Sequence, residues 1–206
     1  YIARALIIAA GSDPNKLHVS GESELTGKGV SYCATCDGPF FRDDEIMVVG
    51  GGNSALDEGL FLTRFASRVS IVHRRDQLRA DKIYQDKAFA NPKVGFIWDS
   101  VVDEIVGQDM VQGVKLKNLK TGDIQEQTTE GVFIFIGTTP NTAFLEGTLQ
   151  LDERGYIVTN DRLETSMPGV WAAGDVQDAV YRQVVTSSGQ GCAAAQEVEK
   201  YLAEGD

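Results

Sequence analysis

A glycine-rich turn between an apolar strand and a helix constrains the fold more than any other feature of this sequence. Residues 45–49 form a short apolar run, and residues 54–66 carry apolar side chains at helical spacing. Between them lies the pattern Gly50-x-Gly52-x-x-Ala55, in the context that a dinucleotide-binding turn requires. There the first glycine permits the tight bend, the second lets a pyrophosphate approach the backbone, and the small third residue lets helix pack on strand. A plain glycine turn is the alternative, and the flanking strand and helix favour nucleotide binding.

The rest of the chain alternates strands with helices, which is typical of an α/β protein with parallel sheets. Apolar strands are predicted at residues 2–10, 45–49, 69–72, 94–98, 132–136, 155–158 and 170–173. The spacing of apolar residues predicts helices at 54–66, 77–90 and 187–202. A different pattern, of antiparallel strands with a hairpin turn at 121–123, is predicted for 101–106, 111–119 and the residues near Ile124.

The charge and hydropathy of the chain argue against nucleic acid and membranes as partners. The 206 residues carry a net charge of −11, which argues against non-specific binding to nucleic acid. No apolar run approaches the roughly 18 residues that a membrane span needs, and no leader precedes Tyr1, so we expect a cytoplasmic protein with no membrane partner. The chain opens directly in a predicted strand and its first residue is not Met. We therefore also expect that an N-terminal part is missing from it.

A cluster of cations follows the second strand of the predicted nucleotide-binding unit. Sites for NAD usually carry Asp or Glu here, about 20 residues past the glycines, to hold the ribose 2′-hydroxyl. This sequence has His73-Arg74-Arg75, with Arg79 one helical turn beyond. Guanidinium groups cannot accept from a hydroxyl in that way, but they bind a 2′-phosphate through charge-assisted hydrogen bonds. A solvated basic patch is the alternative, and the position of the cluster favours NADPH.

Cys33 and Cys36 form a Cys-x-x-Cys motif. A zinc site needs four ligands, and neither Cys192 nor either histidine stands at a metal-ligand spacing from the pair, so no metal is expected. Two cysteines so placed suit thiol–disulfide exchange instead. Asp37, directly after the pair, could give or take a proton during exchange, and an ordinary turn carboxylate is the alternative. Cys192 is predicted to be a small buried residue of the last helix.

Two further motifs carry little information by themselves. Gly174-Asp175 follows an apolar strand, where an acidic residue can meet a ligand hydroxyl outside the sheet. The segment Tyr181-Arg182-Gln183 stands just before the last predicted helix.

Together these motifs resemble one family, the low-molecular-weight thioredoxin reductases. The similar segments, in order, are Cys33-Ala34-Thr35-Cys36-Asp37-Gly38, Gly50-Gly51-Gly52-Asn53-Ser54-Ala55, His73-Arg74-Arg75-Asp76-x-x-Arg79, Gly174-Asp175-Val176 and Arg182-Gln183. The resemblance covers essentially the whole chain and implies an α/β fold of two Rossmann-like, three-layer nucleotide-binding domains. The FAD domain, incomplete here because the family's first third is absent, would comprise residues 1–16 and 139–206. The inserted NADPH domain, which carries the cysteine pair, would comprise residues 17–138.

The resemblance also implies an activity. Such an enzyme is a homodimeric flavoprotein that passes electrons from NADPH through FAD to the Cys33–Cys36 disulfide and then to thioredoxin, with Asp37 as the acid. Arg74, Arg75 and Arg79 would hold the 2′-phosphate of NADPH. The other cofactor-binding residues, with Asp175 at the ribityl chain and residues 182–184 near the flavin ring, would be Gly50, Gly52, Asn53, Ser54, Ala55, His73, Gly137, Gly174, Asp175, Arg182, Gln183 and Val184. One departure is Thr138, where the family commonly has His.

Two other functions fit parts of the sequence. A flavoprotein that reduces a peroxiredoxin shares this core, but it normally uses NADH, so the cluster at residues 73–75 counts against it. A non-catalytic NADPH-binding fragment could use the cysteine pair as a redox sensor. Flavin content separates the alternatives, because a sensor needs no flavin.

Overall fold

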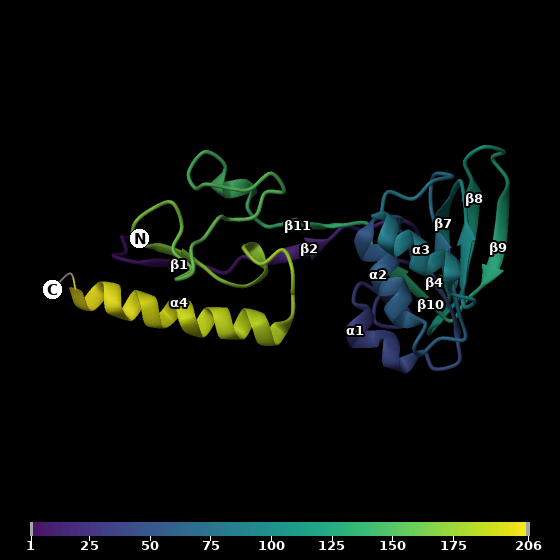
Figure 1. Ribbon diagram of the computed structural model, residues 1–206, viewed down its shortest axis with the longest axis horizontal. Helices are drawn as coiled ribbons and strands as arrows, with labels where there is room; N and C mark the ends of the chain where they lie inside the picture. Colours follow the sequence, from purple (N-terminus) through teal and green to yellow (C-terminus); the bar gives the residue numbers. More distant parts are fainter. Residues whose placement is uncertain (1, 205–206) are drawn as a thin grey trace. The chain divides into compact units, whose positions relative to one another are not determined.

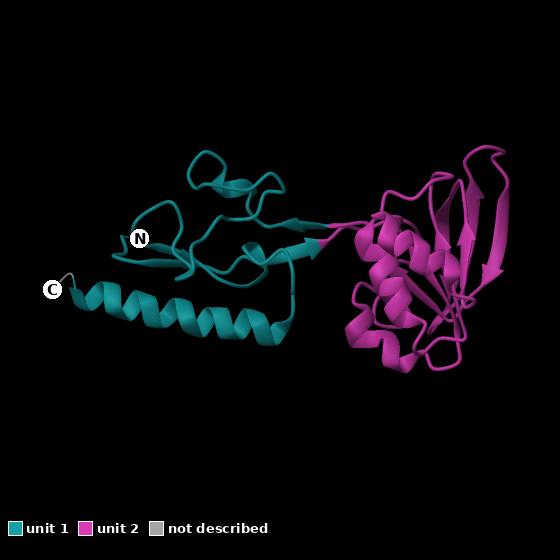
Figure 2. Cartoon of the chain, in the orientation of Figure 1, with its two compact units in different colours: residues 1–13, 138–206 teal, residues 14–137 magenta. Residues whose placement is uncertain are grey.

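The computed structural model of the chain describes residues 2–204. The chain divides into two compact units, which are coloured separately in Figure 2. Unit 1 consists of residues 1–13 and 138–206, and unit 2 consists of residues 14–137.

Unit 2 contains most of the secondary structure (Figure 1). Its elements are β3 (Val30–Ser31), α1 (Ala34–Asp37), the 3-10 helix η1 (Gly38–Phe40), β4 (Glu45–Val49), α2 (Asn53–Leu62), β5 (Arg68–Val72), α3 (Lys82–Ala90), β6 (Val94–Ile97), β7 (Ser100–Gly107), β8 (Val111–Asn118), β9 (Ile124–Thr128) and β10 (Gly131–Ile134). The five strands β3-β10-β4-β5-β6 form a parallel sheet in that order, and β7-β8-β9 form an antiparallel sheet. Both sheet types, and the strand at residues 45–49, are as predicted.

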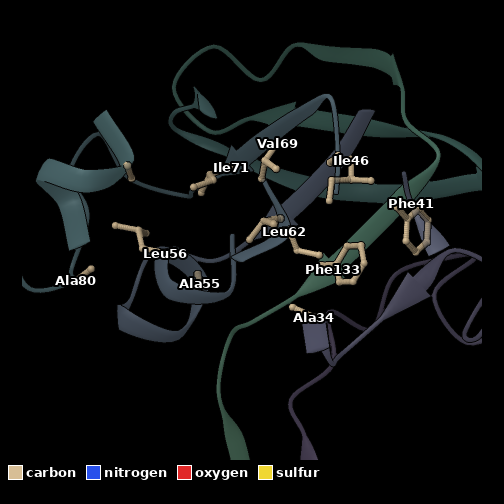
Figure 3. Close-up of a cluster of buried hydrophobic side chains, with 13 residues drawn as sticks. Ala34, Phe41, Ile46, Ala55, Leu56, Leu62, Val69, Ile71, Ala80 and Phe133 are labelled. Atoms are coloured by element: carbon tan, nitrogen blue, oxygen red, sulfur yellow. The ribbon is translucent and has the colours of Figure 1, made fainter. Parts of the chain in front are cut away.

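The parallel sheet is the middle layer of three. Because successive side chains of a strand point to opposite faces, β4 divides its residues between two cores. Ile46 and Val48 belong to a cluster with Leu56 and Leu62 of α2, which Figure 3 shows. The alternate side chains of β4 belong to a second cluster with residues of β7 and β8. Unit 2 is therefore a helix layer, a parallel sheet and an antiparallel sheet, the three-layer arrangement expected from the resemblance.

Two predicted helices are too long at one end. α2 ends at Leu62 rather than residue 66, because the N–H groups of Arg64 and Phe65 donate to carbonyls three residues back and tighten the chain into a turn. α3 begins at Lys82 rather than residue 77. The N–H groups of Arg79 and Ala80 both donate to the carbonyl of Gly51, at 2.7 and 3.1 Å, so this segment is bound to the glycine turn and is not helical.

Unit 1 contains a small parallel sheet and one long helix. Its elements are β1 (Leu6–Ile8), β2 (Ser12–Pro14, whose last residue lies in unit 2), β11 (Thr138–Pro140), η2 (Ala143–Leu145), β12 (Val170–Ala172), η3 (Gly174–Val176) and α4 (Val184–Glu204). β1 pairs in parallel with β12, and β2 pairs with β11. Trp171 packs with Ala194 and Val198 of α4. Its ring also packs edge-on against the ring of Tyr201, with the two ring centroids 5.2 Å apart.

Three predictions for unit 1 need correction. The first strand spans residues 6–8 rather than 2–10. Residues 155–158 form one isolated bridge rather than a strand, because the Asp152 carboxylate accepts from the N–H groups of Arg154 and Tyr156 and turns the chain back. Cys192 is exposed rather than buried. It precedes Ala194 by two residues, about 200° around the helix, so it lies on the face turned away from Trp171.

Among residues 2–204, no helix has both the length and the apolar character that crossing a membrane requires.

The core between α2 and the parallel sheet should dominate the stability of unit 2. Leu62 is fully buried there, whereas Leu119, after β8, is 51% exposed. We expect Leu62→Ala to lower the free energy of unfolding by about 2–5 kcal/mol, and Leu119→Ala to change it by less than about 0.5 kcal/mol. Urea unfolding followed by Trp98 fluorescence in a Trp171→Phe background reports on unit 2. Equal losses in the two variants would contradict the layer assignment.

Candidate functional site

The two cysteines of the Cys-x-x-Cys motif are joined by a disulfide, with their Cα atoms 5.3 Å apart. Cys33 caps the single turn of α1, and the backbone N–H of Cys36 donates to its Sγ at 3.2 Å. Cys36 is exposed, so the disulfide is accessible from the surface of unit 2.

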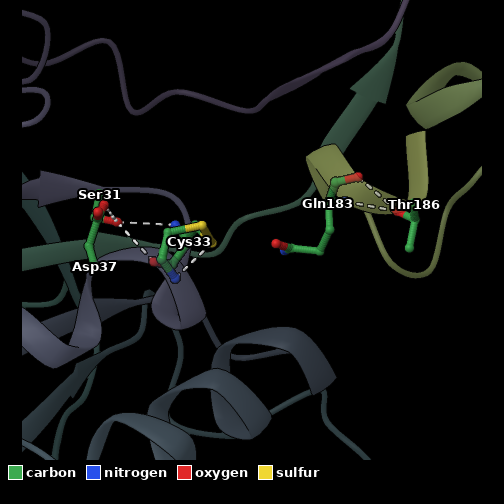
Figure 4. The surroundings of a disulfide bond; sticks show 6 residues. Ser31, Cys33, Asp37, Gln183 and Thr186 are labelled. Carbon is green, nitrogen blue, oxygen red and sulfur yellow. Dashed lines mark hydrogen bonds between the residues drawn. A yellow bond between two sulfur atoms is a disulfide. The ribbon is translucent and has the colours of Figure 1, made fainter. Parts of the chain in front are cut away.

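Asp37 lies beside the disulfide and is held there by Ser31, as Figure 4 shows. The Ser31 hydroxyl donates to Asp37 Oδ2 at 2.6 Å, and the N–H of Cys33 donates to Ser31 Oγ at 3.1 Å. The structure thus brings the three residues that the sequence singled out for dithiol chemistry onto one turn. Ser31 was not foreseen, because a serine at the end of a short strand matches no motif.

The glycine turn has the geometry that its sequence predicts. Gly50 has a φ of +151°, and a Cβ there would lie 2.5 Å from the carbonyl oxygen of Phe135 and 2.6 Å from the Cβ of Ala55. Both the first glycine and the small third residue are therefore required sterically. A Cβ on Gly52, the N-cap of α2, would meet nothing within 4 Å, so open space lies in front of it.

That space is part of a cavity of about 430 Å³ within unit 2. The cavity brings together predicted residues from the turn, from the end of β5 and from the segment after β10. These are Gly50, Gly52, Asn53, Ser54, His73, Arg74, Arg79 and Gly137. Ala55 lies behind the turn in the core, and Arg75 is exposed and outside the cavity lining.

His73 is a buried polar side chain of this cavity, with 4% of its surface exposed. Burial lowers its pKa below the usual value, and the charges of Arg79, Arg74 and Arg75 lower it further, so the ring is neutral at pH 7. Its Nε2 has no hydrogen-bond partner among residues 2–204. A buried polar atom without a partner is costly, so this atom suits contact with a polar ligand.

Asn53 has a structural partner that the sequence did not reveal. Its amide donates to the carboxylate of Asp81 at 2.7 Å and accepts from the backbone N–H of Asp81 at 2.7 Å. Asp81 is the N-cap of α3. The first helical residue after the glycine turn therefore positions the helix that follows the arginine cluster.

A buried carboxylate, Glu22, is a second feature that the sequence did not reveal. It is 1% exposed and accepts from the N–H groups of Leu17 and His18 and from the hydroxyl of Tyr32, at 2.7–2.9 Å. Burial, with help from Glu22, raises the pKa of Tyr32 to about 12. Glu22 thus ties the residue before Cys33 to the start of unit 2. Glu22 lies in a polar stretch of the sequence, where acidic residues are usually exposed. No sequence pattern therefore indicated that it is buried.

The predicted flavin-site residues lie in unit 1. Asp175 stands in η3 at the carboxyl end of β12, and its Oδ1 accepts from the Ser187 hydroxyl at 2.7 Å. The Arg182 guanidinium donates to the Thr138 hydroxyl. Thr138, which departs from the pattern of the family, is therefore a partner of a predicted site residue. The backbone carbonyl of Gln183 accepts a hydrogen bond from the Thr186 hydroxyl (Figure 4). Val184 begins α4 with its side chain exposed.

Comparison with known proteins agrees with this geometry. Residues 1–191 match the family model described as pyridine nucleotide-disulphide oxidoreductase. The chain is 53% identical to a thioredoxin reductase of Rickettsia felis, over 98% of this chain and 66% of that protein, and 50% identical to one of Peptoclostridium litorale, over 99% and 67%. It superposes on the crystal structure of the thioredoxin reductase from Streptococcus pyogenes with a TM-score of 0.93 at 50% identity, covering 97% of this chain and 66% of that one.

The chain therefore belongs to the pyridine nucleotide-disulphide oxidoreductases and, within that family, to the low-molecular-weight thioredoxin reductases, as the resemblance of its motifs indicated. It spans about two thirds of the length of the curated relatives it matches.

The contact between Gly51 and His73 gives a test of the turn. A Cβ on Gly51 would lie 2.3 Å from the His73 ring, which is buried and has little room to move. We expect Gly51→Ala to lower the free energy of unfolding by about 1–3 kcal/mol. Gly52→Ala is the matched control, because its Cβ meets open space and its backbone is extended. Urea unfolding measures both, and equal midpoints would contradict the packing described here.

Proposed function

We propose that this chain carries the dithiol and much of the nucleotide-binding surface of a thioredoxin-disulfide reductase, which passes electrons from NADPH through FAD to Cys33–Cys36 and then to thioredoxin. One observation carries the proposal: unit 2 holds both an accessible disulfide with an adjacent carboxylate and a dinucleotide-type turn facing a basic cavity. The relatives, named thioredoxin reductases, support it. They give no support to a peroxiredoxin-reducing flavoprotein or a redox sensor.

We propose that the cavity of unit 2 binds NADPH in preference to NADH. The open face of Gly52 leaves room for the pyrophosphate, and Arg74 and Arg79 line the same cavity, where they would hold the 2′-phosphate with Arg75 nearby. The carboxylate that follows these arginines, Asp76, is engaged with Lys120 at 3.2 Å rather than offered to a ribose hydroxyl. Nε2 of His73, which is buried without a partner, would supply a further polar contact to the nucleotide.

Unit 1 would supply FAD contacts. Asp175 would bind a ribityl hydroxyl, and Arg182, Gln183 and Val184 would lie near the ring, with Gly174 allowing the approach through its φ of +79°. When bound, the flavin takes hydride from NADPH and passes two electrons to a disulfide. We assign residues 1–16 and 139–206 to the FAD domain and 17–138 to the NADPH domain, which the division into units 1 and 2 supports.

The residues of this chain perform the exchange with the protein substrate. After reduction, the thiolate of one cysteine attacks the substrate disulfide, and Asp37 can protonate the sulfur that leaves. The second cysteine then displaces the substrate and restores the Cys33–Cys36 bond. We further propose that the protein is a cytoplasmic homodimer with thioredoxin as its partner, as the motif resemblance implies.

The dithiol step can be separated from the flavin step. In the full-length enzyme, Cys36→Ser should abolish thioredoxin reduction, because no disulfide can close, while NADPH still bleaches the flavin absorbance. Cys192→Ser is the matched control: that cysteine is free and exposed on α4, and its loss should leave thioredoxin reduction unchanged. A Cys36→Ser enzyme that still reduces thioredoxin, or a full-length protein without flavin, would refute the proposed function.

Cofactor choice tests the role of the arginines. Arg74→Ala combined with Arg79→Ala should raise the Kd for NADPH by roughly 10- to 100-fold, because charge-assisted hydrogen bonds to the phosphate are lost. Binding of NADH should change little. Lys82→Ala removes an exposed cation that lies outside the cavity lining and serves as the control. Titration of the protein with each nucleotide measures the effect, and equal weakening of both would rule out the 2′-phosphate role.

A further inference from the structure

Ser31 ends β3, is 4% exposed, and lies between the carboxylate of Asp37 and the backbone of Cys33. Its Oγ is within hydrogen-bond reach of three atoms: Asp37 Oδ2 at 2.6 Å, the Cys33 nitrogen at 3.1 Å and the Cys33 carbonyl oxygen at 3.3 Å (Figure 4).

The hydrogen-bonding capacity of a hydroxyl decides among these contacts. Serine has one proton to donate and two lone pairs that accept. The Cys33 N–H can only donate, so Ser31 Oγ accepts from it. The single hydroxyl proton then goes to Asp37 Oδ2, because 2.6 Å lies in the range of strong O–H···O⁻ bonds whereas 3.3 Å to the Cys33 carbonyl is long.

This arrangement orients the carboxylate of Asp37. Free rotation about the last side-chain bond would let either oxygen turn away from the sulfurs. With Oδ2 bound to Ser31, rotation is stopped and Oδ1 is left for proton transfer. Because Ser31 Oγ also accepts from the Cys33 N–H, the same hydroxyl holds the carboxylate in a constant relation to the backbone that carries one of the two sulfurs.

We propose that Ser31 is a positioning residue for the proton transfers of the dithiol, acting through Asp37. The inference rests on the proposed function, within which it names a residue that no motif identified. Ser31 does not touch the reacting sulfurs through any contact described here. Its effect is to fix the Asp37 carboxylate relative to the backbone of Cys33, with one carboxylate oxygen left without a bond to Ser31.

The step balances in atoms and electrons. Asp37, ionised, takes the proton of one cysteine thiol, while the other cysteine, a thiolate, attacks a disulfide, RSSR, and forms a mixed disulfide. The departing RS⁻ takes that proton from Asp37 and leaves as RSH. The cysteine that lost its proton attacks the mixed disulfide, closes the Cys33–Cys36 bond and releases a second RS⁻, which takes a proton from water. Two electrons pass from the dithiol to the substrate, and Asp37 ends ionised as it began.

The leaving group supplies a test that a structural role would not satisfy. The full-length protein is reduced, freed of nucleotide and mixed with one of two small disulfides, and the first thiol released is timed. Bis(2-hydroxyethyl) disulfide releases a weakly acidic thiol that needs a proton, whereas 5,5′-dithiobis(2-nitrobenzoic acid) releases a strongly acidic one that does not. Ser31→Ala should slow the first reaction roughly tenfold and the second by less than about twofold. Ser31→Thr keeps the hydroxyl and should restore the rate.

A second comparison keeps the test decisive if the threonine does not fit. Asp37→Asn should slow the hydroxyethyl reaction, and adding Ser31→Ala to Asp37→Asn should slow it no further, because the residue through which Ser31 acts is already gone. Equal slowing of both disulfides by Ser31→Ala, a full further loss in the double variant, or an Asp37→Asn protein as fast as its parent would each overturn the inference. A parent protein that reduces the small disulfide but not thioredoxin would overturn the proposed function and leave the relation of Ser31 to Asp37 standing.

Discussion

The close approach of backbone and side chains at Gly50 and Gly51 is the constraint on which unit 2 depends. Without side chains at these two positions, the carbonyl of Phe135, the Cβ of Ala55 and the ring of His73 all reach the turn. The carbonyl of Gly51 then binds the segment after β5 through two N–H groups. One short turn thus joins β4, α2, β5 and β10, and the cavity proposed to bind a dinucleotide is the space left in front of it. The same glycines therefore set the packing of unit 2 and the shape of this cavity.

The dithiol site is stabilised in a different way, by the burial of one residue and by side-chain hydrogen bonds around a single helical turn. α1 is a single turn, and a helix that short has little stability of its own. It is held by the burial of Ala34 in the core beneath α2 and by Ser31, which binds both the backbone of Cys33 and the carboxylate of Asp37. The hydroxyl of Tyr32, the residue between Ser31 and Cys33, donates a hydrogen bond to the buried Glu22. The accessible disulfide consequently stands on a base fixed by buried polar contacts, which suits the exchange proposed for it.

Much of this could be predicted because it depends on local rules. The apolar run at residues 45–49 and the glycines after it indicated β4 and the turn, and the pattern Cys33-x-x-Cys36-Asp37 indicated the redox pair. The errors arose where distant contacts override local preference. Residues 77–81 have helical spacing, yet Gly51 takes the N–H groups of Arg79 and Ala80. The residues next to Cys192 in the sequence are small, as in a buried helix, but Cys192 itself is exposed. The helix face that packs against Trp171 is the one that carries Ala194.

The sequence by itself determined the class of fold, the redox pair, the strand-to-helix glycine turn and the family, because each of these is written in residue types at short fixed spacings. Only the tertiary structure decided that His73 is buried with an unpartnered Nε2, that Asn53 binds Asp81, and that Ser31 and Glu22 flank the cysteines. These contacts depend on which backbone segments the folded sheet and its loops bring within hydrogen-bond reach. No spacing along the chain carries that information, because a hydroxyl or carboxylate at the surface and one in the interior have the same letter.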